Sequence, residues 1–249
     1  MVPEEHTNTT AALVVIGNEI LSGKVTDSNS GFLARELRTA GVSLERISVI
    51  VDDIATIATE VAECAGAYDV VFTSGGVGPT HDDVTIEGVA QAFGRPVVEH
   101  PGLRLAIEKA VGDTPGSPLL KMAEVPEGAE LISSGDAHFP SVKIENVYVL
   151  PGIPQIFETK VESLCQRFMT SPYHLRQVLV SVNESSIAGH LNATLAAFPA
   201  LLLGSYPTIG NDEYRVRLTL ESKDERYLDS ALEDLVGRIP GDHIVKIER

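Results

Sequence analysis

Strand-like runs alternate with segments of helical periodicity through the first two thirds of the chain, and this order constrains the fold more than any other feature. The runs cover residues 11–16, 44–51, 69–74 and 146–150. The more apolar of them are typical of strands buried on both faces of a parallel sheet. Between the runs, apolar residues recur three and four positions apart, as in amphipathic helices. Alternating strands and helices predict an α/β fold, a mostly parallel sheet with helices on both faces.

Start and stop signals frame the predicted helices. Ser28 and Asn29 give a cap signal before one helix, and Gly41 stands where the end of that helix needs a left-handed residue. Asp52 and Asp53 precede a second helix; one of them is expected to cap it and the other to reach a ligand. Residues 95–139 are rich in glycine and proline, and they predict no regular element.

The pattern changes near residues 171 and 172. Beyond that point strands are predicted at residues 175–182, 201–206, 214–221 and 243–247, with helices at 184–197 and 224–238. This β-α-β-β-α-β order is typical of a small α+β domain. We therefore expect two domains, residues 1–171 and residues 172–249.

The charge balance excludes several classes of partner. The 249 residues include 19 basic and 35 acidic ones, and the formal net charge is -16. Binding to nucleic acid or to an anionic membrane without sequence recognition needs a basic surface, so neither partner is expected. The negative net charge does not exclude an anionic small molecule as ligand, because backbone N–H groups and a metal ion make the electrostatic potential locally positive.

The N-terminus and the cysteines predict a cytoplasmic protein. The first ten residues lack the basic and apolar regions of a signal peptide. The uncharged stretch at residues 185–211 is interrupted by His190, Pro199 and Pro207, so it predicts no membrane span. Cys64 and Cys165 fall in apolar helical stretches and are expected to be buried and reduced.

The strongest candidate site is the segment GGVGPTHDDVT, from Gly75 to Thr85. It follows the carboxyl end of a predicted strand and leads into a helix, which is where open α/β sheets bind ligands. Glycines allow close backbone approach, and a helix N-terminus favours a phosphate. Asp82 and Asp83 offer hard oxygen ligands for Mg²⁺. The simpler interpretation is a glycine turn and a helix cap, but a cap needs only one carboxylate and no third glycine.

A second loop, GNEILSGK at residues 17–24, follows the first strand. It differs from a P-loop because five residues separate its glycines and Val25 replaces the required hydroxyl residue, which disfavours a nucleoside triphosphatase. Glu19 is either a residue of the ligand-facing edge or a solvated loop residue, and Asn29 is a candidate to hydrogen-bond a ligand. His81 is either a general acid or base or a solvated loop histidine.

Taken in order, these motifs resemble those of the CinA-type molybdopterin-binding domain family. The matching segments are GNEILSGK with residues 26–29, VDD at 51–53, GGVGPTHDDVT and LPGIPQIF, within residues 11–170. ESSIA at 184–188 and LGSYP at 203–207 resemble the family's small second domain. Among the branches, the chain resembles most the molybdopterin-binding-like N-terminal region of eukaryotic FAD synthase, which has similar THDDVT, PGIP and GSYP segments.

The resemblance implies a MogA-like three-layer α/β core with a phosphate site at the glycine loop. Carried over by position, the binding residues are Gly17, Glu19, Asn29, Gly75, Gly76, Gly78, Pro79, Thr80, Thr85 and Gly152. The implied metal ligands are Asp82 and Asp83, and the catalytic candidates are these two with Asp52 or Asp53. Asn18 stands where many relatives have Asp, and Val77 replaces the common Leu or Ile; both departures are mild.

Relatives in the CinA and FAD-synthase branches are metal-dependent pyrophosphatases, so the resemblance implies hydrolysis of the diphosphate linkage of FAD or ADP-ribose. The implied cofactor is a divalent ion, Mg²⁺ or a transition metal, with K⁺ as a further candidate. The alternatives are a pterin or nucleotide carrier in molybdenum-cofactor biosynthesis, and a vestigial site on a scaffold. The family implies a homo-oligomer, a dimer or trimer. Because the chain ends at Arg249, neither nicotinamide-nucleotide deamidation nor FAD synthesis is expected.

Overall fold

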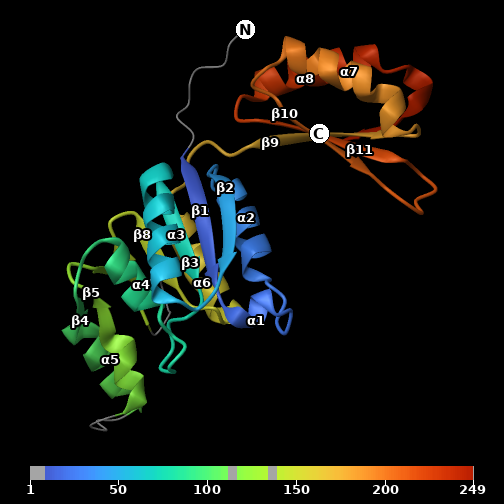
Figure 1. Ribbon diagram of the computed structural model, residues 1–249. Coiled ribbons are helices and arrows are strands. Elements are labelled where there is room, and N and C mark those ends of the chain that lie inside the picture. The colour runs from blue at the N-terminus through green and yellow to red at the C-terminus, as the bar shows by residue number, and fades with distance from the viewer. Residues whose placement is uncertain (1–8, 112–116, 134–138, 249) are drawn as a thin grey trace. The chain divides into compact units, whose positions relative to one another are not determined.

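The chain divides into two compact units, which Figure 1 shows and which are described one at a time. The computed structural model describes residues 9–111, 117–133 and 139–248. One unit ends at Thr170 and the other begins at Ser171, one residue before the predicted boundary. Among the described residues, no helix combines the length and the apolar character that crossing a membrane requires.

A six-stranded sheet forms the centre of the first unit, in the strand order β2-β1-β3-β8-β7-β6. The strands are β1 (Thr10–Ile16), β2 (Ser43–Ile50), β3 (Val70–Ser74), β6 (Glu130–Ile132), β7 (Ser141–Ile144) and β8 (Val147–Leu150). The first four in the spatial order run parallel, and β7 and β6 continue the sheet through antiparallel pairs. The parallel strands therefore end at one common edge.

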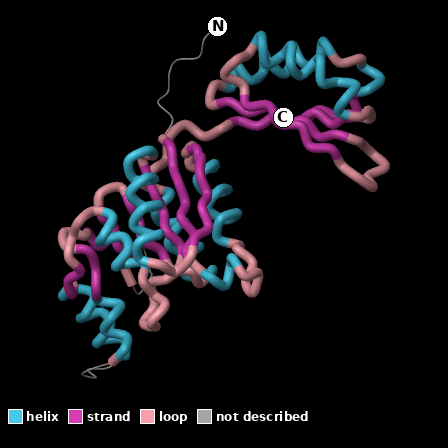
Figure 2. Tube along the Cα trace, viewed as in Figure 1, coloured by secondary structure: helices cyan, strands magenta, loops and turns pink. Residues whose placement is uncertain are grey.

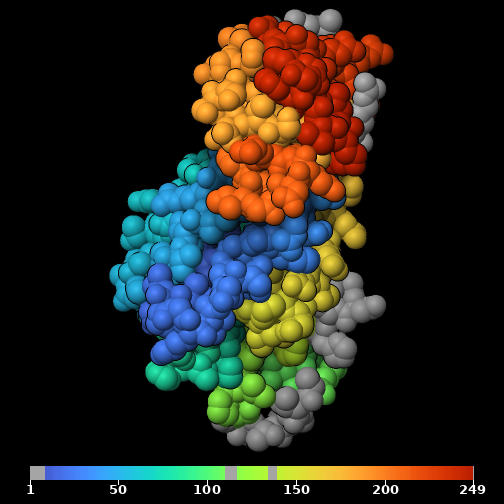
Figure 3. Space-filling view, turned by 90° about the vertical axis from the view of Figure 1, so that its right-hand side faces the viewer, coloured from blue at the N-terminus to red at the C-terminus, as the bar shows by residue number. Residues whose placement is uncertain are grey.

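Helices cover both faces of this sheet (Figure 2), so the unit has the three layers that the sequence predicted. The helices α2 (Asn29–Thr39) and α6 (Pro154–Cys165) lie side by side on one face (Figure 3), and α3 (Ile54–Ala67) and α4 (Thr85–Ala92) lie on the other. In β1, the fully buried Leu13 packs with α2 and α6, whereas Val14 packs with α3. Successive strand side chains point to opposite faces, so an uninterrupted apolar run fits this position.

The ends of two helices follow the sequence signals, but one start does not. Gly41 after α2 has a φ of 78° and Gly94 after α4 has a φ of 60°, the left-handed values that glycine adopts without strain. At the start of α2, the predicted cap residue Ser28 makes no side-chain hydrogen bond. The amide of Ser30 donates instead to Asp27 at 3.0 Å. Ser28 has right-handed helical dihedral angles rather than the extended ones of a capping residue, which explains the difference.

Residues 95–139, for which the sequence predicted no element, include a small subdomain of short elements. They are β4 (Val97–Glu99), α5 (Pro101–Val111), the 3-10 helix η1 (Pro118–Ala123) and β5 (Glu124–Pro126), with β4 and β5 paired antiparallel. Leu103, Ile107, Ala123 and Val125 form its core. Strands of three residues are too short to show a period, so the sequence pattern could not predict them.

The second unit has the predicted β-α-β-β-α-β order. Its strands are β9 (His174–Val180), β10 (Leu202–Pro207), β11 (Val216–Ser222) and β12 (Ile244–Glu248), its helices are α7 (Glu184–Ala197) and α8 (Glu225–Arg238), and a 3-10 turn η2 (Gly241–His243) precedes β12. The sheet is antiparallel, in the order β10-β11-β9-β12. Both helices pack on the sheet around buried Val178, Leu218 and Leu228, which gives this unit a hydrophobic core of its own.

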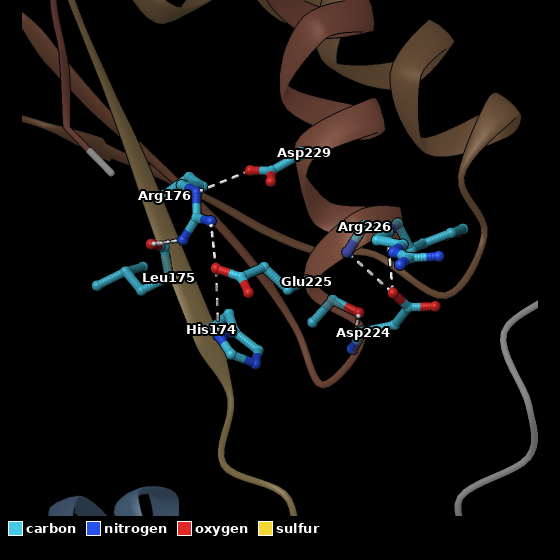
Figure 4. A network of polar contacts seen from close by, with 9 residues as sticks. His174, Leu175, Arg176, Asp224, Glu225, Arg226 and Asp229 are labelled. Atoms are coloured by element: carbon cyan, nitrogen blue, oxygen red, sulfur yellow. Dashed lines mark hydrogen bonds and ion pairs between the residues drawn. The ribbon is translucent and has the colours of Figure 1, made fainter.

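One arginine connects the sheet of the second unit to the start of α8 (Figure 4). The residue Arg176 on β9 is 9% exposed, and its guanidinium donates to Asp229 at 3.0 Å and to Glu225 at 2.9 Å. A third hydrogen bond, at 3.2 Å, goes to the carbonyl oxygen of Leu175. The carboxylates raise the pKa of Arg176 further above its ordinary value, Glu225 most of all. The planar fork of an arginine suits such a fixed, charge-assisted junction.

Candidate functional site

A cavity of about 630 Å³ opens at the edge of the sheet where β1, β3 and β8 end. Ile16, Ser74 and Pro151, at or just after those strand ends, line it. Further wall residues come from the first loop and α2, the glycine loop, η1 and α6: Glu19, Ile20, Val25, Thr26, Asp27, Ser28, Asn29, Gly75, Gly76, Val77, Gly78, Pro79, Asp83, Lys121, Met122, Glu124, Gly152, Ile153, Pro154, Ile156 and Lys160. The candidate loops thus meet at one cavity, in the place where open α/β sheets bind ligands.

Two positions of the glycine loop tolerate no other residue. Gly75 has a φ of 107°, and a Cβ atom there would lie 2.2 Å from the carbonyl oxygen of Ile16. Gly76 has a φ of 63°, and its Cβ would lie 2.4 Å from Thr85 Oγ1. The Thr85 hydroxyl donates to the Gly75 carbonyl at 2.9 Å and its amide to the Gly76 carbonyl at 3.0 Å, so α4 begins tied to the loop. Close packing of backbone on backbone is why glycine is needed here.

The amide groups of Val77 and Gly78 are available to a ligand. Within the part of the chain that the structure describes, neither amide donates to a protein oxygen. Both residues line the cavity. Unpaired backbone N–H groups next to a helix start are suited to a phosphate or another anion.

The two aspartates converge on one residue, Thr80, instead of capping α4. Thr80 donates its amide to Asp83 Oδ2 at 2.8 Å, and its hydroxyl faces Asp82 Oδ1 at 2.6 Å and also the same oxygen of Asp83. The residue before α4 is Val84, which makes no side-chain cap. The simpler interpretation of the aspartates as helix caps is therefore wrong. The hydrogen bond from the Thr80 hydroxyl is also the main cause that lowers the pKa of Asp82.

Of the two aspartates, only Asp83 lines the cavity. Asp83 belongs to its wall, whereas the side chain of Asp82 is 63% exposed and Asp82 is not among the wall residues. In the described residues no group of three acidic, histidine or cysteine side chains forms a complete metal site. Mg²⁺ is commonly held by one or two carboxylates together with waters and phosphate oxygens, so this donor set fits an ion that binds with a phosphate ligand.

Asn29 lies deep in the wall and connects two of the loops. Its side chain, only 5% exposed, donates from Nδ2 to Ser74 Oγ at 2.9 Å and to the Gly152 carbonyl at 3.0 Å. Oδ1 of Asn29 is buried without a hydrogen-bond partner. Gly152 in turn packs so closely that a Cβ there would lie 3.2 Å from Gly75 Cα. An unpaired buried acceptor is costly, and a ligand donor would satisfy it.

The structure does not bring Asp52 and Asp53 to the cavity wall. Asp52 accepts a hydrogen bond at 2.7 Å from the amide of Asn18, in the short helix α1 (Asn18–Leu21). Asp53 caps α3, because it accepts from the amide of Thr56 at 2.9 Å, and this bond is the main cause that lowers the pKa of Asp53. Both carboxylates thus have structural partners, as helix-starting aspartates commonly do.

Some of the remaining predicted residues line the cavity, and the others lie outside its wall. Glu19 and Pro79 line the cavity, whereas Gly17, Thr80 and Thr85 are not among its wall residues and shape the loops behind it. The residue His81 is not a wall residue either, and its side chain is 98% exposed, as a solvated loop histidine would be.

Sequence reasoning missed two charged residues beside the glycine loop. Lys121 from η1 donates to the carbonyl oxygens of Thr80 at 3.3 Å and Asp83 at 2.5 Å, and it pairs with Glu87 Oε1 at 3.4 Å. Glu87 Oε2 is buried and has no hydrogen-bond partner. The only sequence signal was the position of Glu87 in the first turn of α4. Lys121 comes from the subdomain that the sequence pattern did not predict.

A third missed residue, Lys160 on α6, lies in the cavity wall with its amine buried. Nζ donates to the Phe139 carbonyl at 2.7 Å and to Ser141 Oγ at 3.3 Å. Burial lowers the pKa of Lys160 to about 8. On a helix of alternating polar and apolar residues a lysine normally indicates the solvent-facing side, so no pattern in the sequence pointed to a buried Lys160.

The wall beyond these polar groups is apolar. Leu103, Met122, Phe139, Val142 and Ile156 contribute to it from five different segments. A cavity that combines polar groups with apolar wall residues suits a ligand that combines a charged part with a flat ring system.

Two family descriptions match the chain, and they divide it where the units divide. Residues 12–171 match a family described as a probable molybdopterin binding domain. Residues 172–248 match the middle domain of FAD synthase.

Individual proteins are similar over most of the chain. A protein of Archaeoglobus fulgidus is 36% identical over 198 residues, which cover 80% of this chain and 86% of that protein. A probable FAD synthase of Caenorhabditis elegans is 34% identical over 266 residues, covering 95% of this chain and 51% of that protein. The chain thus spans about half the length of this relative. The crystal structure of CinA from Thermoplasma acidophilum, a protein of unknown function, has a TM-score of 0.60 at 28% identity and covers 65% of this chain and 98% of that one.

Proposed function

This chain belongs to the molybdopterin-binding domain family, as its motifs predicted, and on that premise we propose that its cavity binds a nucleotide diphosphate and hydrolyses the diphosphate linkage with a divalent metal ion. The first substrates to test are FAD and ADP-ribose. Similarity of residues 172–248 to the FAD synthase middle domain, and of 95% of the chain to part of a probable FAD synthase, supports a flavin or adenine nucleotide as ligand.

One observation carries the proposal: free backbone amides and a pair of carboxylates lie on the same short loop. Val77 and Gly78 line the cavity, and their amides have no protein acceptors among the described residues. Asp82 and Asp83 lie a few residues further on and share the Thr80 hydroxyl. Amides attract a phosphate, whereas carboxylates repel it unless a cation lies between them. The combination therefore favours a phosphate together with a cation over either one alone.

The residues of the chain supply binding, orientation and charge compensation. The loop amides hold one phosphate and stabilise the charge that gathers on its oxygens in the transition state. We assign to Asp83, which lines the cavity, the role of orienting the attacking water. Water oxygen bonds to one phosphorus and loses a proton to solvent, the bond from that phosphorus to the bridging oxygen breaks, and the bridging oxygen leaves with the other phosphate. A divalent ion, when bound, neutralises phosphate charge and lowers the pKa of a water ligand.

The test is incubation of the purified chain with FAD or ADP-ribose in the presence of Mg²⁺, Mn²⁺ or Co²⁺, with products separated by chromatography. We expect release of AMP together with FMN or ribose phosphate, and its loss on addition of EDTA. If the chain binds these nucleotides or a pterin tightly and cleaves neither nucleotide with any of the three ions, the hydrolase proposal is wrong. That result would favour the carrier function instead.

A further inference from the structure

Lys160 places a positive charge in the cavity wall, and among the described residues no opposite charge lies beside it. It lies in the second turn of α6 and is 4% exposed. Its two hydrogen-bond acceptors, the carbonyl oxygen of Phe139 and the hydroxyl oxygen of Ser141, are both neutral. Among the described residues no carboxylate pairs with it, and burial is the sole cause that shifts its pKa.

This arrangement costs free energy in the protein without ligand. An ammonium has three N–H donors, and the protein accepts from two of them. A buried charge without a counter-charge loses its hydration and gains little in return. An apolar side chain would fill the same wall at no such cost, as Ile156 does one turn earlier on α6. A lysine at this position therefore needs an explanation beyond packing.

The position of α6 relates Lys160 to the glycine loop. The helix starts at Pro154, two residues after Gly152, which packs against Gly75. Lys160 follows six residues later, about 9 Å along the helix axis. Helical side chains lean toward the N-terminus of their helix, so the lysine extends back in the direction of the loop. Both Lys160 and the loop residues Gly76 to Gly78 line the same cavity.

We infer that Lys160 is an anion-binding residue of this cavity, which pairs with the phosphate of the bound diphosphate that the glycine loop does not hold. The inference rests on the proposed function only in that the ligand carries a diphosphate; it requires no turnover. A diphosphate linkage brings two negative charges into the cavity. Loop amides and a cation compensate one end, and the buried ammonium compensates the other and gains a counter-charge that none of the described residues supplies.

A non-hydrolysable ligand separates binding from turnover. The probe is the α,β-methylene analogue of ADP-ribose, in which CH₂ replaces the bridging oxygen, and its affinity is measured by calorimetry with Mg²⁺ present. We expect Lys160→Met to weaken binding by about 10- to 100-fold. The matched control is Lys143→Met, which removes the same charge from β7 outside the cavity wall, where Lys143 pairs with Glu130 at 3.3 Å. It should change the affinity by less than about threefold.

A second variant distinguishes charge from packing. In Lys160→Ala, added ethylammonium should restore part of the affinity, whereas ethanol, of similar size and without charge, should not. The inference is wrong if wild type does not bind the analogue, if Lys160→Met binds it as tightly as Lys143→Met, or if ethanol restores binding as well as ethylammonium. Tight binding that depends on Lys160, without cleavage of ADP-ribose itself, would overturn the proposed hydrolysis and leave this inference standing.

Discussion

Asp83 is the residue on which the proposed chemistry depends most. Its carboxylate lines the cavity and accepts the amide hydrogen of Thr80. Asp83→Asn keeps the size of the side chain but removes the charge that would bind a cation. We expect kcat/KM for the cleaved nucleotide to fall by at least about 100-fold. Initial rates over a range of substrate and metal concentrations check this, and an unchanged rate would remove Asp83 from the mechanism.

Asp53 serves as the contrasting carboxylate, because it caps α3 and is not a wall residue. Asp53→Ala should lower the midpoint of urea unfolding, since the amide of Thr56 loses its acceptor. Turnover should stay at the wild-type level. If activity were lost from a variant that remains folded, Asp53 would act in catalysis after all.

Lys160 makes stability depend on pH in a predictable direction. The pKa of Lys160 in the folded protein, about 8, lies below its ordinary value of 10.5. Between these values the unfolded chain binds more protons than the folded one, so wild type gains stability relative to Lys160→Met as pH rises. The gain should reach roughly 3 kcal/mol near pH 10.5 and vanish below pH 8. Urea unfolding of both proteins at several pH values measures it, and parallel profiles would contradict it.

At the scale of single residues, the sequence predicted the loop but not the charges around it. Three glycines and two adjacent aspartates after a strand are more than a turn and a helix cap require, so residues 75–85 could be identified as a candidate site. Lys121, Glu87 and Lys160 are charged residues on or near helices, where most such residues face solvent. Their surroundings depend on the subdomain between α4 and β7, whose three-residue strands β4 and β5 are too short to show a period.

At the scale of elements, the long apolar runs and helices were predictable because one pattern repeats along each of them. The start of α2 was not, since Asp27 rather than Ser28 accepts the first amide. Both residue types are common caps, so composition alone does not choose between them. The backbone dihedral angles determine which of the two residues caps the helix, and these angles depend on how the first loop packs against the sheet.

The junction between the glycine loop and α4 should be sensitive to one hydroxyl. Thr85 is fully buried, and its Oγ1 donates to the Gly75 carbonyl. Thr85→Val keeps the shape and leaves that carbonyl without this donor, so we expect a loss of about 1–2 kcal/mol in the free energy of unfolding. Because the loop is then less well fixed, KM should rise more than kcat falls. Denaturation curves and steady-state kinetics check both parts; unchanged KM would show that the hydroxyl only stabilises the fold.

In the second unit, Arg176 joins β9 to α8. Arg176→Met should cost about 1–2 kcal/mol, a limited amount because the side chains of Glu225 and Asp229 are half exposed and become hydrated once unpaired. Chemical denaturation followed by circular dichroism measures the loss. A cost above about 4 kcal/mol would mean that the junction holds the whole unit together.

At the scale of the whole molecule, each unit has its own hydrophobic core. Leu228 is fully buried in the second one, so Leu228→Ala should destabilise that unit by about 2–5 kcal/mol. If the units unfold separately, calorimetry will show one transition shifted and the other in place, with nucleotide cleavage unchanged at temperatures below both. A single transition that shifts as a whole would show that the units are coupled.

The shared hydroxyl of Thr80 has one more consequence. It carries a single hydrogen, yet carboxylate oxygens of both Asp82 and Asp83 lie within reach of it. At any instant one of these oxygens is left facing a lone pair, and two like charges stand close together. A cation between them would end that competition and settle the side chains into one arrangement. The segment should therefore stiffen when it binds an ion, and the order in which ion and nucleotide arrive should matter for the rate.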